Sequence, residues 1–302
     1  MKNENTGHVT AGQVNRIYKS TLFAMLFEDK DNLLELYNAM SKKHYTDPEL
    51  LEINTLENAI YMSIRNDVSF LIDDRLSLYE HQSTYSPNLP LRFLFYVSSL
   101  YSGMTREDNL YGTRAVKISP PEFIIFYNGE EERPEREILR LSDLYSAEDE
   151  NVSLELKAVM LNIRGNHNEA LKKACKTLRE YAAFTDKMRE YVKIQSIEAA
   201  AERTIEECIR GNILKDFLEK HKAEVKKVSI FEYDQEKHIK MERKEAWEEG
   251  KAAGISEGKN LALAELIQKK MKKGKTIAQI AEELETDEAM VACIVEKEKT
   301  GH

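Results

Sequence analysis

Two carboxylates and an amide lie within one short segment, NDVSFLIDDRLSLYEHQS, which covers residues 66–83: they are Asp67, Glu80 and Gln82. Two carboxylates on one face of a sheet repel each other, and a cation between them removes that repulsion. Their hard oxygen atoms suit Mg²⁺ or Mn²⁺. The Gln82 amide could orient an attacking water, although it cannot accept a proton as a base would. This spacing indicates a divalent-metal site.

A hairpin would position these groups. The apolar runs from Val68 to Ile72 and from Leu76 to Gln82 predict two antiparallel strands, and Asp73-Asp74 suits a two-residue turn. Asp67 then lies opposite Glu80, with Cβ atoms about 4.5–5.5 Å apart. Gln82 shares the face of Glu80 because side chains alternate along a strand, and the backbone carbonyl of His81 could be a further ligand. A four-residue turn would keep the faces but shift the pairing.

A second interpretation stays open at this point. Acidic residues at strand ends are usually solvated surface groups that bind nothing. The residue types and spacing alone favour the two interpretations about equally.

The elements around the hairpin are predicted from hydrophobic periodicity. Apolar residues from Ile17 to Phe27 and a stretch from Asn32 to Ser41 predict two helices, and the segment from Leu91 to Tyr101 predicts a third that starts after Pro90. Further strands are expected at Ala59–Ile64 and Phe123–Tyr127. The first part of the chain is therefore predicted to be α/β.

The chain after about Ser146 is charged and amphipathic and has no proline beyond Pro134, which predicts helices there. Glycines recur at positions 250, 254 and 258, which indicates a flexible or loosely paired helical connector. The last segment predicts two short helices around Glu285-Thr286-Asp287. They resemble a helix-turn-helix, but the second begins with acids that would repel phosphate, so a packing or dimerisation module is favoured. The expected domains are 14–145, 146–245 and 246–302.

Composition limits the functional classes. The 302 residues include 44 Lys and Arg against 53 Asp and Glu, a net charge of -9, so any DNA contact must be local. No stretch is long and apolar enough to span a membrane, and no signal peptide is expected. Three separated cysteines, at positions 175, 208 and 293, indicate neither a disulfide framework nor a zinc site and fit a reducing cytoplasm.

Asp67 followed by Glu80-His81-Gln82 resembles the D…ExK signature of PD-(D/E)XK nucleases, in a variant with Gln in place of Lys. More broadly, the chain is similar to the Rpn family of recombination-promoting nucleases and putative transposases. That similarity covers most of residues 16 to 250 and includes the phrases YKSTLFAMLFED, NLPLRFLFYVSSLY, EFIIFYNG, ECIRGNILKDFLEKHKAEV and SIFEYDQEKHIKMERKEAWEEG.

The resemblance implies a restriction-endonuclease-like mixed-sheet core that hydrolyses DNA with Mg²⁺ or Mn²⁺ and acts in recombination or transposition. It implies that Asp67 and Glu80 hold the metal and that Gln82 stands where many relatives have Lys. Family nucleases often add an acid from the first core helix, for which Glu35 is the candidate, although it could equally be an exposed helix acid. Arg92 could contact a DNA phosphate or be a surface residue.

Two rival functions remain open from the sequence. A catalytically degenerate core could bind nucleic acid without cutting it. Alternatively, the helical half could dominate, making the chain an oligomeric interaction protein that self-associates even without residues 1–145.

Overall fold

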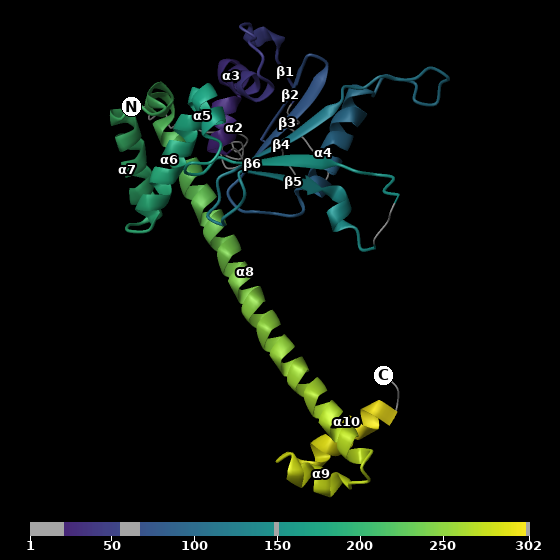
Figure 1. Ribbon diagram of the computed structural model, residues 1–302. Helices are drawn as coiled ribbons and strands as arrows, with labels where there is room; N and C mark the ends of the chain where they lie inside the picture. The colour runs from purple at the N-terminus through teal and green to yellow at the C-terminus, as the bar shows by residue number, and fades with distance from the viewer. Residues whose placement is uncertain (1–20, 55–66, 148–150, 300–302) are drawn as a thin grey trace, which may run out of the picture. The chain divides into compact units, whose positions relative to one another are not determined.

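The computed structural model describes residues 21–54, 67–147 and 151–299. Its contacts divide the chain into two compact units, with the first ending at Glu236 and the second starting at Lys237. The first unit contains a sheet with helices on both faces (Figure 1). The expected α/β class is therefore confirmed for this unit.

A six-stranded mixed sheet runs in the order β1-β2-β3-β4-β6-β5. The outer pairs β1–β2, β2–β3 and β5–β6 are antiparallel, whereas β3–β4 and β4–β6 are parallel. The strands are β1 (Glu52–Ile53), β2 (Val68–Ile72), β3 (Arg75–Gln82), β4 (Pro121–Tyr127), β5 (Arg136–Arg140) and β6 (Lys157–Asn162).

The β2–β3 hairpin has the predicted register. Val68 pairs with Tyr79 and Ile72 with Arg75, and Asp73 and Asp74 form the turn with φ angles of 52° and 54°. Positive φ at both turn residues is the geometry whose twist matches that of paired strands. Asp73 also contacts Lys43 and Tyr45, which fixes the turn to the segment after the first helices.

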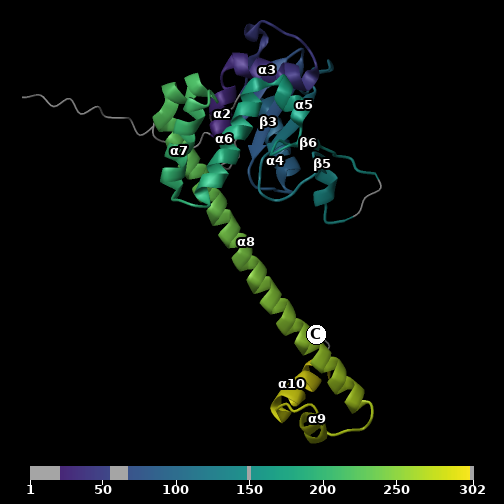
Figure 2. The same ribbon diagram turned by 60° about the vertical axis from the view of Figure 1, so that its left-hand side comes forward.

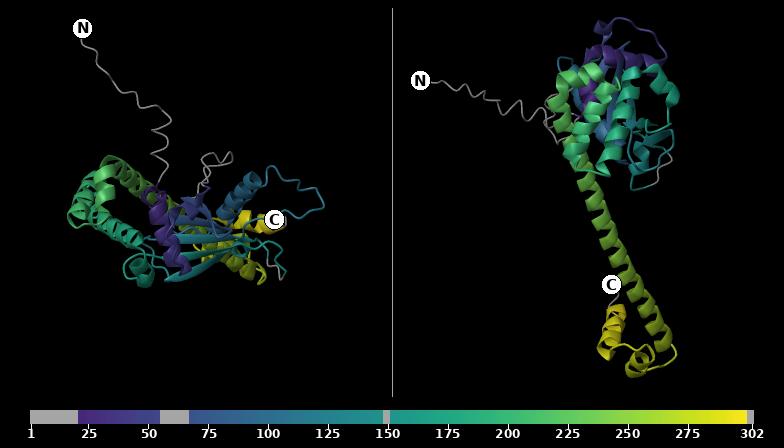
Figure 3. Two further views of the ribbon diagram at one scale, coloured as in Figure 1. Left: turned by 90° about the horizontal axis from the view of Figure 1, so that it is seen from above. Right: turned by 90° about the vertical axis from the view of Figure 1, so that its left-hand side faces the viewer.

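Helices cover the two faces separately (Figures 1 and 3). Helix α4 (Leu89–Met104) packs on one face, and Figure 2 shows α3, α5 and α6 in front of the other. The remaining elements of this unit are α2 (Leu22–Phe27), α3 (Lys30–Ser41), α5 (Glu169–Ala174), α6 (Lys176–Val192), α7 (Ile197–Arg210), the start of α8 (Lys215–Met271), and 3-10 turns at Pro48–Leu50 and Leu141–Leu144.

Side-chain alternation on β3 produces two cores. Tyr79 packs with Phe23 and Phe126 in the core beneath α2, α3 and α6, whereas Leu76 and Leu78 pack in the core beneath α4. Glu80 and Gln82 continue the row of Leu76 and Leu78, so they share one face, as predicted, and this is the face that α4 covers.

The expected helical region after Ser146 is wrong over Lys157–Asn162, which forms β6 between β4 and β5. Its Ala158 and Met160 are fully buried among residues of β4 and β5, so long-range pairing overrides the charged sequence around them. The sheet therefore extends past the predicted domain boundary at 145. The strand expected at Ala59–Ile64 lies outside the described residues.

The second unit contains the rest of α8, α9 (Ile277–Glu283) and α10 (Glu288–Lys299). The two terminal helices are those predicted around Glu285-Thr286-Asp287. Ile280, Ala281 and Val291 pack against Ile267 of α8, while Met290 is 43% exposed. The glycine-spaced connector is a continuous part of α8.

The turn gives a first testable prediction. Asp74 is exposed and adopts a left-handed conformation that costs a non-glycine residue free energy, so Asp74→Gly should raise the free energy of unfolding by about 0.5–1 kcal/mol. Asp74→Val should lower it, because β-branched residues tolerate positive φ poorly. Urea unfolding of both variants measures the difference. Equal stability of the two would contradict the assigned turn.

Candidate metal and catalytic site

The candidate site lies where β3 and its parallel neighbour β4 end. Glu80 and Gln82 are among the last residues of β3 that pair with β4. The backbone N–H of Asn128, just after β4, donates to the Gln82 carbonyl. In open α/β sheets this end of the strands is where ligands usually bind. Asp67 directly precedes β2 and so reaches the same end of the sheet.

Asp67 is held by two donors from different segments. The Thr21 hydroxyl donates to Oδ1 at 3.0 Å, and the backbone N–H of His81 donates to Oδ2 at 2.7 Å. Thr21 also caps helix α2, because its hydroxyl oxygen accepts from the Ala24 N–H at 3.0 Å. The start of α2 and the end of β3 therefore fix the position of this carboxylate.

Glu80 is buried and contacts two other predicted site residues, Arg92 and Gln82. Arg92, in the first turn of α4, places Nη2 2.5 Å from Glu80 Oε1, and Gln82 Nε2 donates to the same oxygen at 2.8 Å. The structure thus brings Arg92 to Glu80, on the α4 face of the sheet. Both contacts use Oε1, which leaves Oε2 as the oxygen that can face a cation.

Electrostatics couple the two acids. Burial raises the pKa of Glu80 well above its usual range, the Arg92 charge opposes that rise, and the charge of Asp67 adds to it. Burial likewise raises the pKa of Asp67, against the donors from His81 and Thr21 and the Arg92 charge. Each acid is thus easier to ionise when positive charge is added between them.

His81 contributes its backbone to this site and its side chain to the opposite face. Since the N–H and C=O of a strand residue point to the same side, the His81 carbonyl faces the side of Asp67, as a third ligand requires. The imidazole stacks on Phe23 and meets the edge of Tyr181, and burial lowers its pKa to about 4. The ring is therefore neutral at physiological pH and supports the strand rather than supplying charge.

Glu232, from α8, is a residue that sequence reasoning missed. Its Oε1 accepts from the Leu22 N–H at 3.3 Å, so consecutive residues at the start of α2 contact Glu232 and Asp67. Burial, with a contribution from the Asp67 charge, raises the pKa of Glu232 to about 8. No local pattern marks this acid, because it lies far along the chain in an amphipathic helix.

Glu35 has a different position from the one proposed for a family acid. Its carboxylate accepts from the backbone N–H groups of Lys176, at 2.8 Å, and Thr177, at 3.2 Å, at the start of α6. A carboxylate there satisfies donors that a helix N-terminus leaves unpaired. Glu35 thus joins α3 to α6, and the structure does not bring it to Asp67 and Glu80.

The donor set can be tested against a metal. Within the described residues, no three His, Cys, Asp or Glu side chains are arranged to hold an ion. Two carboxylates and a backbone carbonyl nevertheless fit Mg²⁺, which keeps several waters and is typically bound through one or two carboxylates. The residues fit the chemistry of this ion, with Glu232 close by but bonded to Leu22.

Comparisons with protein-family models, with curated proteins and with solved structures find no match to this chain. In the described part of the chain, no helix is long and apolar enough to cross a membrane.

The buried acids predict a pH dependence of stability. The folded-state pKa of Glu80 is raised, so the folded protein holds a proton that the unfolded chain releases, and stability falls as pH rises toward 8. The pKa of His81 is lowered, so His81 makes stability fall as pH falls, and it does so only below its ordinary pKa of 6.5. Glu80 alone should therefore cost the metal-free protein roughly 1–2 kcal/mol of unfolding free energy between pH 6.5 and pH 8.

Urea unfolding at the two pH values measures this loss. Glu80→Gln should reduce the loss because it removes one ionisable group, and Glu107→Gln, an exposed acid, should leave it unchanged. A wild-type stability that rises over this interval would contradict the assignment.

Proposed function

We propose that this protein is a metal-dependent endonuclease of the PD-(D/E)XK type that hydrolyses phosphodiester bonds of DNA. The observation that carries the proposal is the pair of carboxylates, the half-buried Asp67 and the buried Glu80, at the end of the parallel strands. Buried acids with raised pKa values beside one another are typical of functional sites. The mixed sheet is compatible with the nuclease core that the sequence resembles.

Each residue has a role that its contacts support. Asp67 and Glu80 would bind Mg²⁺ or Mn²⁺ together with the His81 carbonyl, and the Thr21 hydroxyl keeps Asp67 in place. When bound, the metal supplies a hydroxide from coordinated water and stabilises charge on the scissile phosphate. Gln82 would orient the attacking water, since its amide can both donate and accept but cannot take the proton.

Arg92 has a second task in this proposal. It neutralises Glu80 while no metal is bound, and once a cation takes that role its guanidinium can turn to a phosphate oxygen of DNA. Arg92 is about one-third exposed, so it can reach a substrate without unfolding α4.

DNA as the substrate, and a role in recombination or transposition, rest on the resemblance to Rpn-type nucleases. With a net charge of -9, the protein must hold DNA through a local contact and the metal rather than through an overall positive field. We place the reaction in the cytoplasm, where the free thiols of Cys175, Cys208 and Cys293 stay reduced.

Cleavage assays test the proposal. Purified protein with supercoiled plasmid and labelled single- and double-stranded DNA should cut in Mg²⁺ or Mn²⁺ and not in EDTA. Asp67→Asn and Glu80→Gln should each lower the rate at least about 100-fold, because each removes a charge on which the metal depends. Asp108→Asn and Glu107→Gln remove exposed acids of the same kinds and should cut normally.

Absence of cutting by every form would refute the endonuclease. If DNA binding were retained in that case, the chain would be a degenerate nuclease core that binds nucleic acid. Wild-type rates in Asp67→Asn and Glu80→Gln would show that any activity lies elsewhere or in a contaminant.

Replacement of Arg92 should change the metal-binding affinity and the cleavage rate in opposite directions. Arg92→Gln removes the positive charge that competes with a cation at Glu80, so the metal-binding affinity should rise about 3- to 10-fold. The cleavage rate should fall, because the phosphate contact is lost. Titration calorimetry with Mn²⁺ measures the first effect and the plasmid assay the second.

Arg92→Lys is the matched control for charge. It should keep metal affinity near the wild-type value while losing the forked geometry of the guanidinium. Weaker metal binding by Arg92→Gln would show that Arg92 supports the carboxylates rather than competing with a metal.

A further inference from the structure

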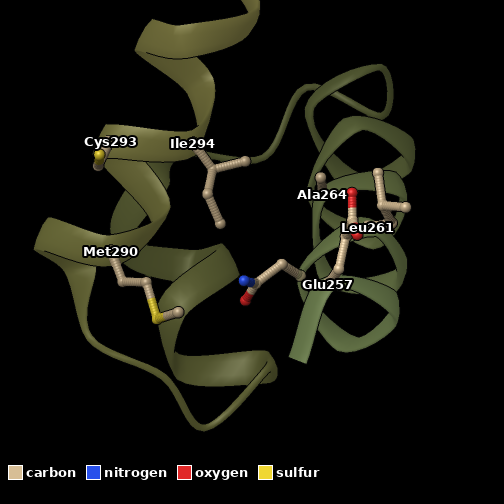
Figure 4. A pocket seen from close by; sticks show the side chains of 7 residues that line it. Glu257, Leu261, Ala264, Met290, Cys293 and Ile294 are labelled. Carbon is tan, nitrogen blue, oxygen red and sulfur yellow. The ribbon is translucent and has the colours of Figure 1, made fainter. Parts of the chain in front are cut away.

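Helix α8 supplies two features that the proposed function leaves without a role. In the second unit, α8 and α10 line a pocket of about 450 Å³, and Figure 4 shows Leu261 of α8 across from Ile294 of α10. Apolar side chains predominate in its lining, so it offers little to a metal site. The other feature is the carboxyl group of Glu232 in the first unit, which contacts the segment that holds Asp67.

Packing of the first part of α8 places Glu232. Val225 and Val228 are buried in the core that also contains Leu22 and Phe23 of α2. Residue 232 follows Val228 by four residues and Val225 by seven, so it lies on the same face of the helix. The side chain of Glu232 therefore meets the start of α2.

At that point Glu232 satisfies a backbone donor. Its Oε1 accepts a hydrogen bond from the backbone N–H of Leu22 at 3.3 Å. An N–H in the first turn of a helix has no acceptor within the helix, so an acceptor from elsewhere fixes that turn. Leu22 follows Thr21, whose hydroxyl donates to Asp67 Oδ1 at 3.0 Å. The peptide bond between residues 21 and 22 thus joins the contact of Glu232 to the contact of Asp67.

The Thr21 hydroxyl has two partners, which restricts where it can lie. Its oxygen accepts from the Ala24 N–H at 3.0 Å while its hydrogen is donated to Asp67. If the first turn of α2 lost its contact with Glu232, it could move and draw the hydroxyl away from Asp67. The His81 N–H, at 2.7 Å, would still hold Asp67 in the site but would fix its orientation less well.

We propose that Glu232 is a positioning residue for the metal site, which holds the first turn of α2 so that the Thr21 hydroxyl stays on Asp67. The carboxylate of Asp67 then keeps the orientation that binds Mg²⁺ or Mn²⁺. This inference rests on the proposed function, because it needs Asp67 to be a metal ligand. Glu232 acts through its hydrogen bond and does not contact the metal.

Titration calorimetry of the full chain with Mn²⁺, in the absence of DNA, tests this role. Partners that orient a metal ligand contribute about 10- to 100-fold to metal affinity, and Asp67 keeps one donor, so Glu232→Ala should weaken Mn²⁺ binding about tenfold. Glu232→Leu, which fills more of the same space without an acceptor, should do the same. Circular dichroism shows which of the two variants is folded well enough to compare.

Glu232→Gln separates the hydrogen bond from the charge. It removes the acid but keeps a side-chain oxygen that can accept from the Leu22 N–H, so it should restore Mn²⁺ affinity to within about twofold of the wild type. Glu219→Ala removes an exposed acid of the same helix and is the control for a general effect on α8.

Thr21 tests the path by which Glu232 acts. Thr21→Val removes the hydroxyl that bonds to Asp67 and should weaken Mn²⁺ binding at least as much as Glu232→Ala does. Adding Glu232→Ala to Thr21→Val should cause little further loss, because the start of α2 then has no hydroxyl to place on Asp67. Two losses that multiply in the double variant would contradict this path.

Plasmid cleavage gives a second measurement. In Glu232→Ala the Mn²⁺ concentration at half-maximal rate should rise about tenfold, whereas the rate at saturating Mn²⁺ should change much less. A wild type that binds no Mn²⁺ would overturn both the proposed function and this role. Unchanged Mn²⁺ binding by Glu232→Ala, beside a wild type that binds Mn²⁺, would overturn only the role of Glu232. A Glu232→Gln variant as weak as Glu232→Ala would show that the charge matters and would overturn positioning through the hydrogen bond.

Discussion

The Asp67 carboxylate depends on donors from two segments that are distant in the sequence. Thr21, at the start of α2, and the backbone of His81, on β3, both donate to it. A half-buried carboxylate without donors would be costly, so these contacts restrict how α2 can lie against the sheet. Glu80, one residue from His81 on the other face, adds a second charge and with it the need for Arg92 from α4. Helices on both faces are thus tied to one pair of acids.

The β2–β3 hairpin places Asp67 and Glu80 at the same end of the sheet. A slip of one residue in its register would move Glu80 and Gln82 to the face of Phe23 and Tyr181 and bring Tyr79 to the α4 side. Positive φ at Asp73 and Asp74, with the contact from Asp73 to Lys43, specifies one register. The position of the site follows from the turn as much as from the site residues.

The local part of this structure could be predicted from the sequence, and the long-range part could not. Strand alternation and turn chemistry were sufficient for the hairpin register, and the helix expected after Pro90 begins two residues earlier, at Leu89, with Pro90 in its first turn. Strand β6 was missed because its pairing partners lie 17 to 35 residues away and its flanks are charged. Glu35 and Glu232 were misjudged or missed because both meet their partners only after the helices pack. Acidic residues in helices look alike in the sequence. Only the fold shows which N–H groups they accept from.

The positive charge beside Glu80 comes from a helix and not from residue 82 of β3. A lysine there would bring a cation on the strand itself, two residues from Glu80. Gln82 instead donates an uncharged N–H to Glu80, and the cation comes from Arg92 on α4, at the same oxygen. A guanidinium on a helix can leave Glu80 without disturbing the strand, and it offers a planar fork that suits phosphate. Because Arg92 and Gln82 reside on different elements, either side chain can be altered without removing the other.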